Sequence, residues 1–195
     1  MSLTVIVVLL ILAALIASLV WLIPTKVRYT ETLVIEAPAQ LLYDNTRFQA
    51  RLMEWSAWPS ETGSTCTCES TDGQVGARTV FISKGKRFGH QEVTRLVDGQ
   101  SVELALVSKG PPQKPLLRFD FIPLADSRTE VRLSFDNTLA RPFNVILRLA
   151  GIVRWTRSMH VKDLQGLKRY SEPPFLTYVG QPLGAATSAS GPNAG

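Results

Sequence analysis

The order of hydrophobic and polar positions separates an apolar N-terminal segment from the rest of the chain. Residues 3–23 contain no charged side chain and only two polar ones. Roughly 21 residues, each rising about 1.5 Å in a helix, match the hydrocarbon thickness of a bilayer, about 30 Å. Trp21 stands near the end, where an indole prefers the headgroup level, and Pro24 ends the helix. The pattern predicts a transmembrane anchor at residues 1–25.

A cleaved signal peptide is the alternative reading of this segment. It needs a basic N-terminal region and a shorter apolar run. Residues 1–4 offer only the α-amino group, so we expect the anchor to be retained. Lys26 and Arg28 follow the helix directly, and a Lys/Arg bias at one end favours the cytoplasmic side for that end. We therefore expect a cytoplasmic domain, although anchors with very short N-terminal tails insert either way.

Alternation then predicts a strand, followed by a short helical region. Residues 26–36 place apolar side chains at every second position for much of their length. Pro38 suits the first turn of a helix. Apolar residues at three- and four-residue spacing across positions 40–54 predict one or two short helices, closed by residues 55–59.

Six further strand patterns follow at a steady interval. Between them stand turn-forming residues such as Asp72-Gly73 and Asp98-Gly99, which favour antiparallel hairpins in a meander. The expected strands are Thr65–Ser70, Ala77–Ser83, Phe88–Leu96, Val102–Val107, Leu116–Pro123 and Glu130–Leu139.

A long helical pattern from Pro142 to about Tyr170 completes the domain. A curved antiparallel sheet with one long helix on its concave face is an α+β, two-layer arrangement, and it leaves a cavity between the layers. Residues 26–171 are therefore expected to form one domain. Pro, Gly, Ala and Ser dominate residues 172–195, a composition typical of a disordered tail.

Three stretches resemble the START-like superfamily, also called SRPBCC or polyketide cyclase/dehydrase-like, in its membrane-anchored variety. They are VIEAPAQLLYDNTRF with EWSAW, then FDFIPLADSRTEVRLSF, then DLQGLKRY. The second departs from the family's usual Gly-Thr hairpin, having Ser127-Arg128-Thr129 instead. The resemblance implies the helix-grip fold over residues 26–171 and a cavity suited to a lipid, isoprenoid or polyketide. It names no catalytic residue.

Charge favours a membrane neighbour over nucleic acid. The net charge of +5 lies outside the apolar segment, and the nearest anionic surface is the bilayer. No Arg/Lys run with interleaved aromatic residues indicates nucleic-acid binding, so none is expected.

Cys66 and Cys68 lie two apart and face one side of a strand, too close for disulfide geometry. We expect no metal and no cofactor.

Candidate cavity residues come from the aromatic and titratable positions of the predicted sheet and its flanking turn. His90 is a candidate base, and the two glutamates are candidates for polarising a ligand; His160 is expected on a solvated basic face. No phosphate-binding loop, nucleophile elbow or metalloprotease motif occurs, and no catalytic residue is expected, so an enzyme is the less favoured class. The candidates are Trp55, Trp58, His90, Glu92, Glu103, Phe119 and Phe121.

The start of the C-terminal helical pattern is apolar nearly all round, so it needs cover on more than one side. The domain core takes one face, and the other needs a membrane surface, a partner transmembrane helix or the mouth of a ligand cavity. A plain gripping helix with solvated Arg and Lys is the alternative. The contact residues are Phe143, Ile146, Leu147, Arg148, Ile152, Arg154 and Trp155.

Two function hypotheses follow. The first is a membrane-tethered START-like module that binds an apolar ligand at the bilayer surface without catalysis. The alternative is an accessory or assembly subunit of a larger membrane complex, for example an electron-transport complex, with a vestigial cavity. Small residues at helical spacing in the anchor permit close helix approach and support this alternative. They are Ala13, Ala14, Ala17 and Ser18.

Overall fold

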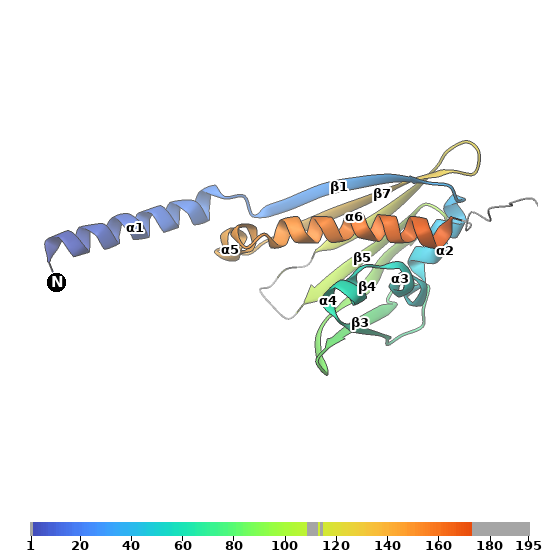
Figure 1. Ribbon diagram of the computed structural model, residues 1–195, viewed down its shortest axis with the longest axis horizontal. Coiled ribbons are helices and arrows are strands. Elements are labelled where there is room, and N and C mark those ends of the chain that lie inside the picture. Colours follow the sequence, from blue (N-terminus) through green and yellow to red (C-terminus); the bar gives the residue numbers. More distant parts are fainter. Residues whose placement is uncertain (1, 109–112, 114, 173–195) are drawn as a thin grey trace, which may run out of the picture.

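Seven strands form one antiparallel sheet, and one long helix runs across it (Figure 1). The computed structural model describes residues 2–108, 113 and 115–172. The strands are β1 (Lys26–Ile35), β2 (Thr65–Cys68), β3 (Arg78–Ser83), β4 (Lys86–Val97), β5 (Ser101–Ser108), β6 (Leu116–Pro123) and β7 (Thr129–Thr138). The helices are α1 (Leu3–Leu22), α2 (Ala39–Arg47), α3 (Gln49–Trp55), α4 (Trp58–Thr62), α5 (Phe143–Leu149) and α6 (Ile152–Ser171).

The sheet order is β1-β7-β6-β5-β4-β3-β2. Strands β2 to β7 form a meander, and the first strand joins it beside the last. Tight turns produce this order because each hairpin places consecutive strands side by side. The α+β class and the helix-grip arrangement expected from the sequence are confirmed.

Alternation decides which side chains fill the space under α6. On β6, Leu117, Phe119 and Phe121 are buried, whereas Arg118 and Asp120 pair with each other on the outer face of the sheet. We call outer the face opposite α6. The inner face of β7 continues this core, and α6 covers it with residues three or four apart.

The closest approach of α6 to the rest of the domain lies at Gly166. A Cβ atom at this position would stand 2.1 Å from the carbonyl oxygen of Trp55, in the last turn of α3. Trp55 is held in turn: its indole N–H donates to the Asn45 carbonyl (2.9 Å), and its ring meets Phe119 edge-on. Only glycine permits this contact between the two helices.

Two details of the helices differ from the sequence-based expectation. The single helix predicted from Pro142 to Tyr170 was wrong, because α5 ends at Leu149 and α6 begins at Ile152. Gly151 between them has φ +74°, a left-handed conformation that interrupts a helix and that glycine adopts without strain. The short helix α4 was not predicted; Pro59 occupies its first turn.

Helix α1 extends away from the domain, and none of its residues is buried (Figure 1). It is long and apolar enough to cross a membrane. Side chains at the start of α5 and just before it hold its C-terminal end: Asn144 donates to the Ile23 carbonyl (2.8 Å), and Arg141 to the Val20 carbonyl (3.1 Å). The expected tail lies almost wholly outside the described residues.

Replacing Gly166 with alanine should destabilise the domain, although the same change usually stabilises a helix by about 1 kcal/mol. The added methyl group forces α6 away from Trp55, and overpacking of this kind costs about 1–3 kcal/mol. Denaturant titration of the full chain in detergent, followed by tryptophan fluorescence, measures the loss. Gln165→Ala, on the exposed side of the same helix, should stay within about 0.5 kcal/mol of wild type. Equal stability of the two variants would disprove the close contact.

Candidate functional site

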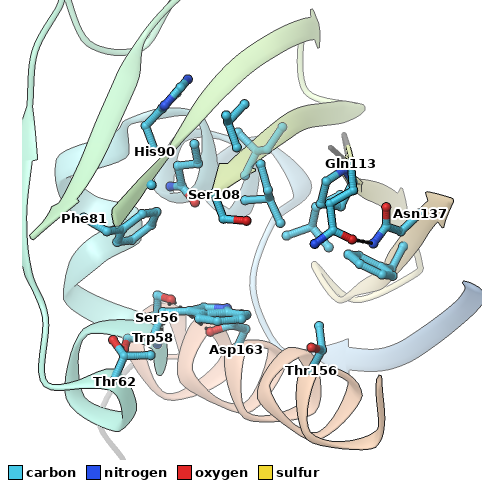
Figure 2. Close-up of a pocket in the computed structure, with 18 of the residues that line it drawn as sticks. Ser56, Trp58, Thr62, Phe81, His90, Ser108, Gln113, Asn137, Thr156 and Asp163 are labelled. Atoms are coloured by element: carbon cyan, nitrogen blue, oxygen red, sulfur yellow. Dashed lines mark hydrogen bonds between the residues drawn. The ribbon is translucent and has the colours of Figure 1, made fainter. Parts of the chain in front are cut away.

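A cavity of about 250 Å³ lies between the inner face of the sheet and α6 (Figure 2). Apolar side chains supply most of its wall. The sheet contributes Leu104, Leu106, Leu117, Phe119 and Phe135, and the helices contribute Leu52, Trp55, Trp58, Leu147, Ile152 and Val153. The cavity exists because α6 packs tightly near its C-terminal end, at Gly166, while its first turns carry no buried residue before Met159.

The cavity opens at one end of the sheet. Val107 and Ile152 line it and are also exposed, by 39% and 43%. They stand at the end of β5 and at the start of α6, so the opening lies between these two elements. We call this opening the mouth; Ser108, which is exposed too, borders it on the β5 side.

Asp163 of α6 is the buried carboxylate at the floor of the cavity (Figure 2). One of its oxygens accepts hydrogen bonds from the Ser56 hydroxyl (3.0 Å) and the Ala57 amide (2.8 Å), and the other from the Trp58 indole (3.2 Å). Burial raises the pKa of Asp163 to about 6, and these three donors oppose that rise. The carboxylate thus fixes the connection between α3 and α4 against α6.

His160 lies one turn earlier on α6 and is fully buried among aromatic rings. Its Nδ1 shares a hydrogen bond with the Tyr29 hydroxyl (2.9 Å), and the Phe135 ring lies 5.1 Å away, centroid to centroid. Burial lowers the pKa of His160 to about 4 and raises that of Tyr29. The expectation that His160 lies on a solvated face was wrong.

Two amide side chains add polarity to the wall. Gln91 donates to the Gln49 carbonyl oxygen (2.7 Å), and both are buried. Asn137 donates to the Gln113 carbonyl oxygen (2.9 Å), and its own Oδ1 is buried without a hydrogen-bond partner among the described residues. An acceptor left in this state is costly in a folded protein unless water or a ligand meets it.

Four of the seven candidate cavity residues border the cavity: Trp55, Trp58, His90 and Phe119. Trp58 lies above Asp163, and its ring meets Trp155 edge-on. The ring of His90 points away from Trp58 and Asp163 (Figure 2). His90 therefore borders the cavity from β4 without its ring facing the cavity floor. Burial and the nearby arginines lower its pKa.

The other three candidates lie elsewhere, and their assignment to the cavity was wrong. Glu92 forms an ion pair with Arg78 (2.5 Å), and Glu103 accepts from the Thr94 hydroxyl (3.0 Å); both stand on the outer face. Phe121 is buried against Tyr43 of α2, in the core beyond the cavity.

The residues predicted to contact a membrane or partner fall into two groups. Leu147 lines the cavity instead of the surface, and Arg148, which is partly exposed, donates to the backbone carbonyls of Pro24 and Lys26. The remaining five are exposed: Phe143, Ile146, Ile152, Arg154 and Trp155.

Sequence reasoning missed Asp163 as a site residue. The available signal was its spacing, since Met159, Asp163 and Leu167 recur at four-residue intervals on the buried side of α6. In the described part of the chain, no three His, Cys, Asp or Glu side chains gather closely enough to hold a metal ion.

No family model matches the sequence, and no curated protein matches it. Solved structures do share its architecture. Truncated norcoclaurine synthase from Thalictrum flavum is 10% identical, with 74% of this chain and 92% of that one covered and a TM-score of 0.58. The Aha1 dimer from Colwellia psychrerythraea is 17% identical over 75% and 96% of the two chains, with a TM-score of 0.54.

Major latex-like protein 151 from Panax ginseng gives a further match, at 11% identity over 76% of this chain and 99% of that one, with a TM-score of 0.52. At such identities the likeness concerns the fold alone. It covers nearly the whole of each relative and about three quarters of this chain.

The pKa values of Asp163 and His160 predict opposing pH effects on stability. The folded carboxyl group, with a pKa raised from 3.8 to about 6, stabilises the fold at low pH and loses this contribution as pH rises through that range. The folded imidazole, with a pKa lowered from 6.5 to about 4, loses its contribution as pH falls through that range. Each effect is on the order of 3 kcal/mol, so the two nearly cancel in the wild type.

Removing one of the two groups should therefore expose the pH dependence of stability that the other group causes. The free energy of unfolding of Asp163→Asn should rise between pH 4 and 6.5, and that of His160→Gln should fall between pH 4 and 6. Denaturant titrations of the full chain in detergent at several pH values measure both slopes. Profiles parallel to the wild type would show that these groups do not titrate as their burial implies.

Proposed function

We propose that this chain binds an apolar small molecule in the cavity under α6, in a domain tethered to a membrane by α1. The observation that carries the proposal is the cavity itself, which is lined mainly by aliphatic and aromatic side chains and opens at a mouth. Its volume of about 250 Å³ approaches the lower end of the range typical of ligand pockets, about 300 Å³.

The chemistry of the wall supports a ligand that is apolar along most of its length. The buried Asn137 Oδ1, which lacks a partner among the described residues, favours one hydrogen-bond donor on that ligand, such as a hydroxyl group. Lipids, isoprenoids and polyketides all include molecules of this kind.

Binding is favoured over catalysis by the state of the buried titratable groups. Asp163 already accepts three hydrogen bonds from protein donors, so it serves the packing of α3 and α4. His160 is enclosed by Tyr29, Trp58 and Phe135. The oxygens of Asp163 are therefore already engaged where it meets the cavity, and His160 is not among the lining residues, so neither is placed as a free general acid or base.

Tethering is supported by α1, whose 20 residues include no buried one and are apolar enough to span a bilayer. The rival function, an accessory subunit of a membrane complex, uses the same helix as a partner-binding surface. That rival assumes a vestigial cavity, and a cavity of about 250 Å³ with a mouth favours the ligand-binding function instead.

Native mass spectrometry of the full chain, extracted from its membrane in mild detergent, tests the proposal. We expect one apolar small molecule per chain. Val153→Phe should abolish it, because the larger side chain fills the cavity from α6. Gln165→Phe, a matched change on the exposed side of α6, should keep it.

A constant set of protein partners without a small molecule would favour the accessory-subunit function. Loss of the small molecule in both variants would show that it binds outside the cavity.

Membrane orientation has a separate test. We propose that the domain is cytoplasmic, from the basic residues that follow α1. Cys68 is an exposed free thiol, so a membrane-impermeant maleimide should label the chain only after cells are permeabilised. Cys68→Ser should lower the labelling, since Cys66 is only partly exposed. Labelling of intact cells would place the domain on the other side.

A further inference from the structure

The mouth of the cavity and helix α1 lie at the same end of the sheet. Lys26, the first residue of β1 after α1, pairs with Thr138 at the end of β7. The registers then place the start of β6, the end of β5 and the β3–β4 turn at this end as well. Helix α6 also begins here, beside α5 (Figure 1). A membrane crossed by α1 therefore faces the mouth.

Helix α5 presents an uncovered apolar surface at this end. Phe143, Ile146 and Leu149 are exposed by 38%, 54% and 78%, and they recur at three-residue spacing. Leu147, one turn after Phe143 on the same helix, lines the cavity wall. Helix α5 therefore separates the cavity from the surroundings of the domain.

Basic side chains lie at the same end of the sheet as this surface. Lys84 and Lys86 extend from the β3–β4 turn and Arg154 from the first turn of α6; all three are exposed, and none forms an ion pair within the described residues. An exposed apolar helix and free cations at one end of a domain match the interfacial region of a bilayer that contains anionic lipids.

Contacts with α1 fix the position of this surface relative to the end of that helix. Arg141, Asn144 and Arg148 donate to carbonyl groups between Val20 and Lys26, and the Arg141 guanidinium lies 4.7 Å from the centroid of the Trp21 ring. These contacts hold α5 against the C-terminal end of α1, where a bilayer would end.

We propose that α5 lies in the interfacial layer of an anionic bilayer and that the mouth opens onto that layer, so that the ligand passes between membrane and cavity without crossing water. This inference rests on the proposed membrane tether and ligand, and it adds the surface and the route. The occupant of the α5 surface is lipid, and a partner protein is the competing outcome.

Fluorescence quenching by brominated phospholipids tests the position of α5. The full chain, with Cys66→Ser and Cys68→Ser, is labelled with an environment-sensitive dye at Ile146→Cys and placed in vesicles of phosphatidylcholine and phosphatidylglycerol. We expect brominated lipid to remove most of the fluorescence. The same dye at Ala125→Cys, in the exposed β6–β7 turn at the far end of the sheet, should be unaffected.

Lys84→Glu with Lys86→Glu should reduce the quenching at Ile146, and so should vesicles of phosphatidylcholine alone. Quenching at Ile146 no greater than at Ala125 would overturn the proposal. If the dye at Ile146 is then shielded from an aqueous quencher only in native membranes, a protein occupies the surface.

A photoreactive fatty acid dissolved in the vesicle bilayer tests the route. It should label the lining residues Ile152 and Val153, and Ile146→Asp should lose most of this labelling. The same variant, dissolved in detergent without a bilayer, should still bind the fatty acid. Labelling unchanged by Ile146→Asp would overturn the route. If the wild type carries no bound molecule, the proposed ligand-binding function is wrong. The dye experiment would still show whether α5 lies in the bilayer.

Discussion

The contact between Gly166 and the Trp55 carbonyl sets the geometry on which the rest of the domain depends. One helix cannot fill the inner face of a seven-stranded sheet, so its position decides where empty space remains. Because Gly166 has no side chain, the C-terminal half of α6 can approach α3 closely. The first turns of α6 carry no buried residue before Met159, and the cavity lies between them and the sheet.

Asp163 lies between these two regions and ties them together. Its three hydrogen bonds hold the α3–α4 connection, and through Trp58 they hold one wall of the cavity. A buried carboxylate is costly, and donors on both oxygens offset that cost. The cavity wall therefore owes its shape partly to a polar network beneath it rather than to apolar packing alone.

The strands were predictable to within a few residues because alternation and turn residues are local signals. Which side chains of β4 point toward α6 was not predictable from the sequence. This strand carries polar side chains on both faces, and a bulge between Val93 and Arg95 shifts its register. Glu92 was misplaced for this reason. His160 was misplaced because its charged neighbours Arg157 and Lys162 suggested solvent, whereas its burial depends on β1 and β7, which are distant in sequence. Phe119, in contrast, follows from a clear two-faced strand.

Hydrogen bonds from Arg141, Asn144 and Arg148 link the end of α1 to the domain. Helix α1 is about 30 Å long, close to the thickness of an average hydrocarbon core. In a thicker or thinner bilayer, a helix of fixed length changes its tilt or deforms the lipid around it. If α1 spans a bilayer as proposed, a domain hydrogen-bonded to its end turns with it, and the thickness of that bilayer would set the angle at which the domain stands.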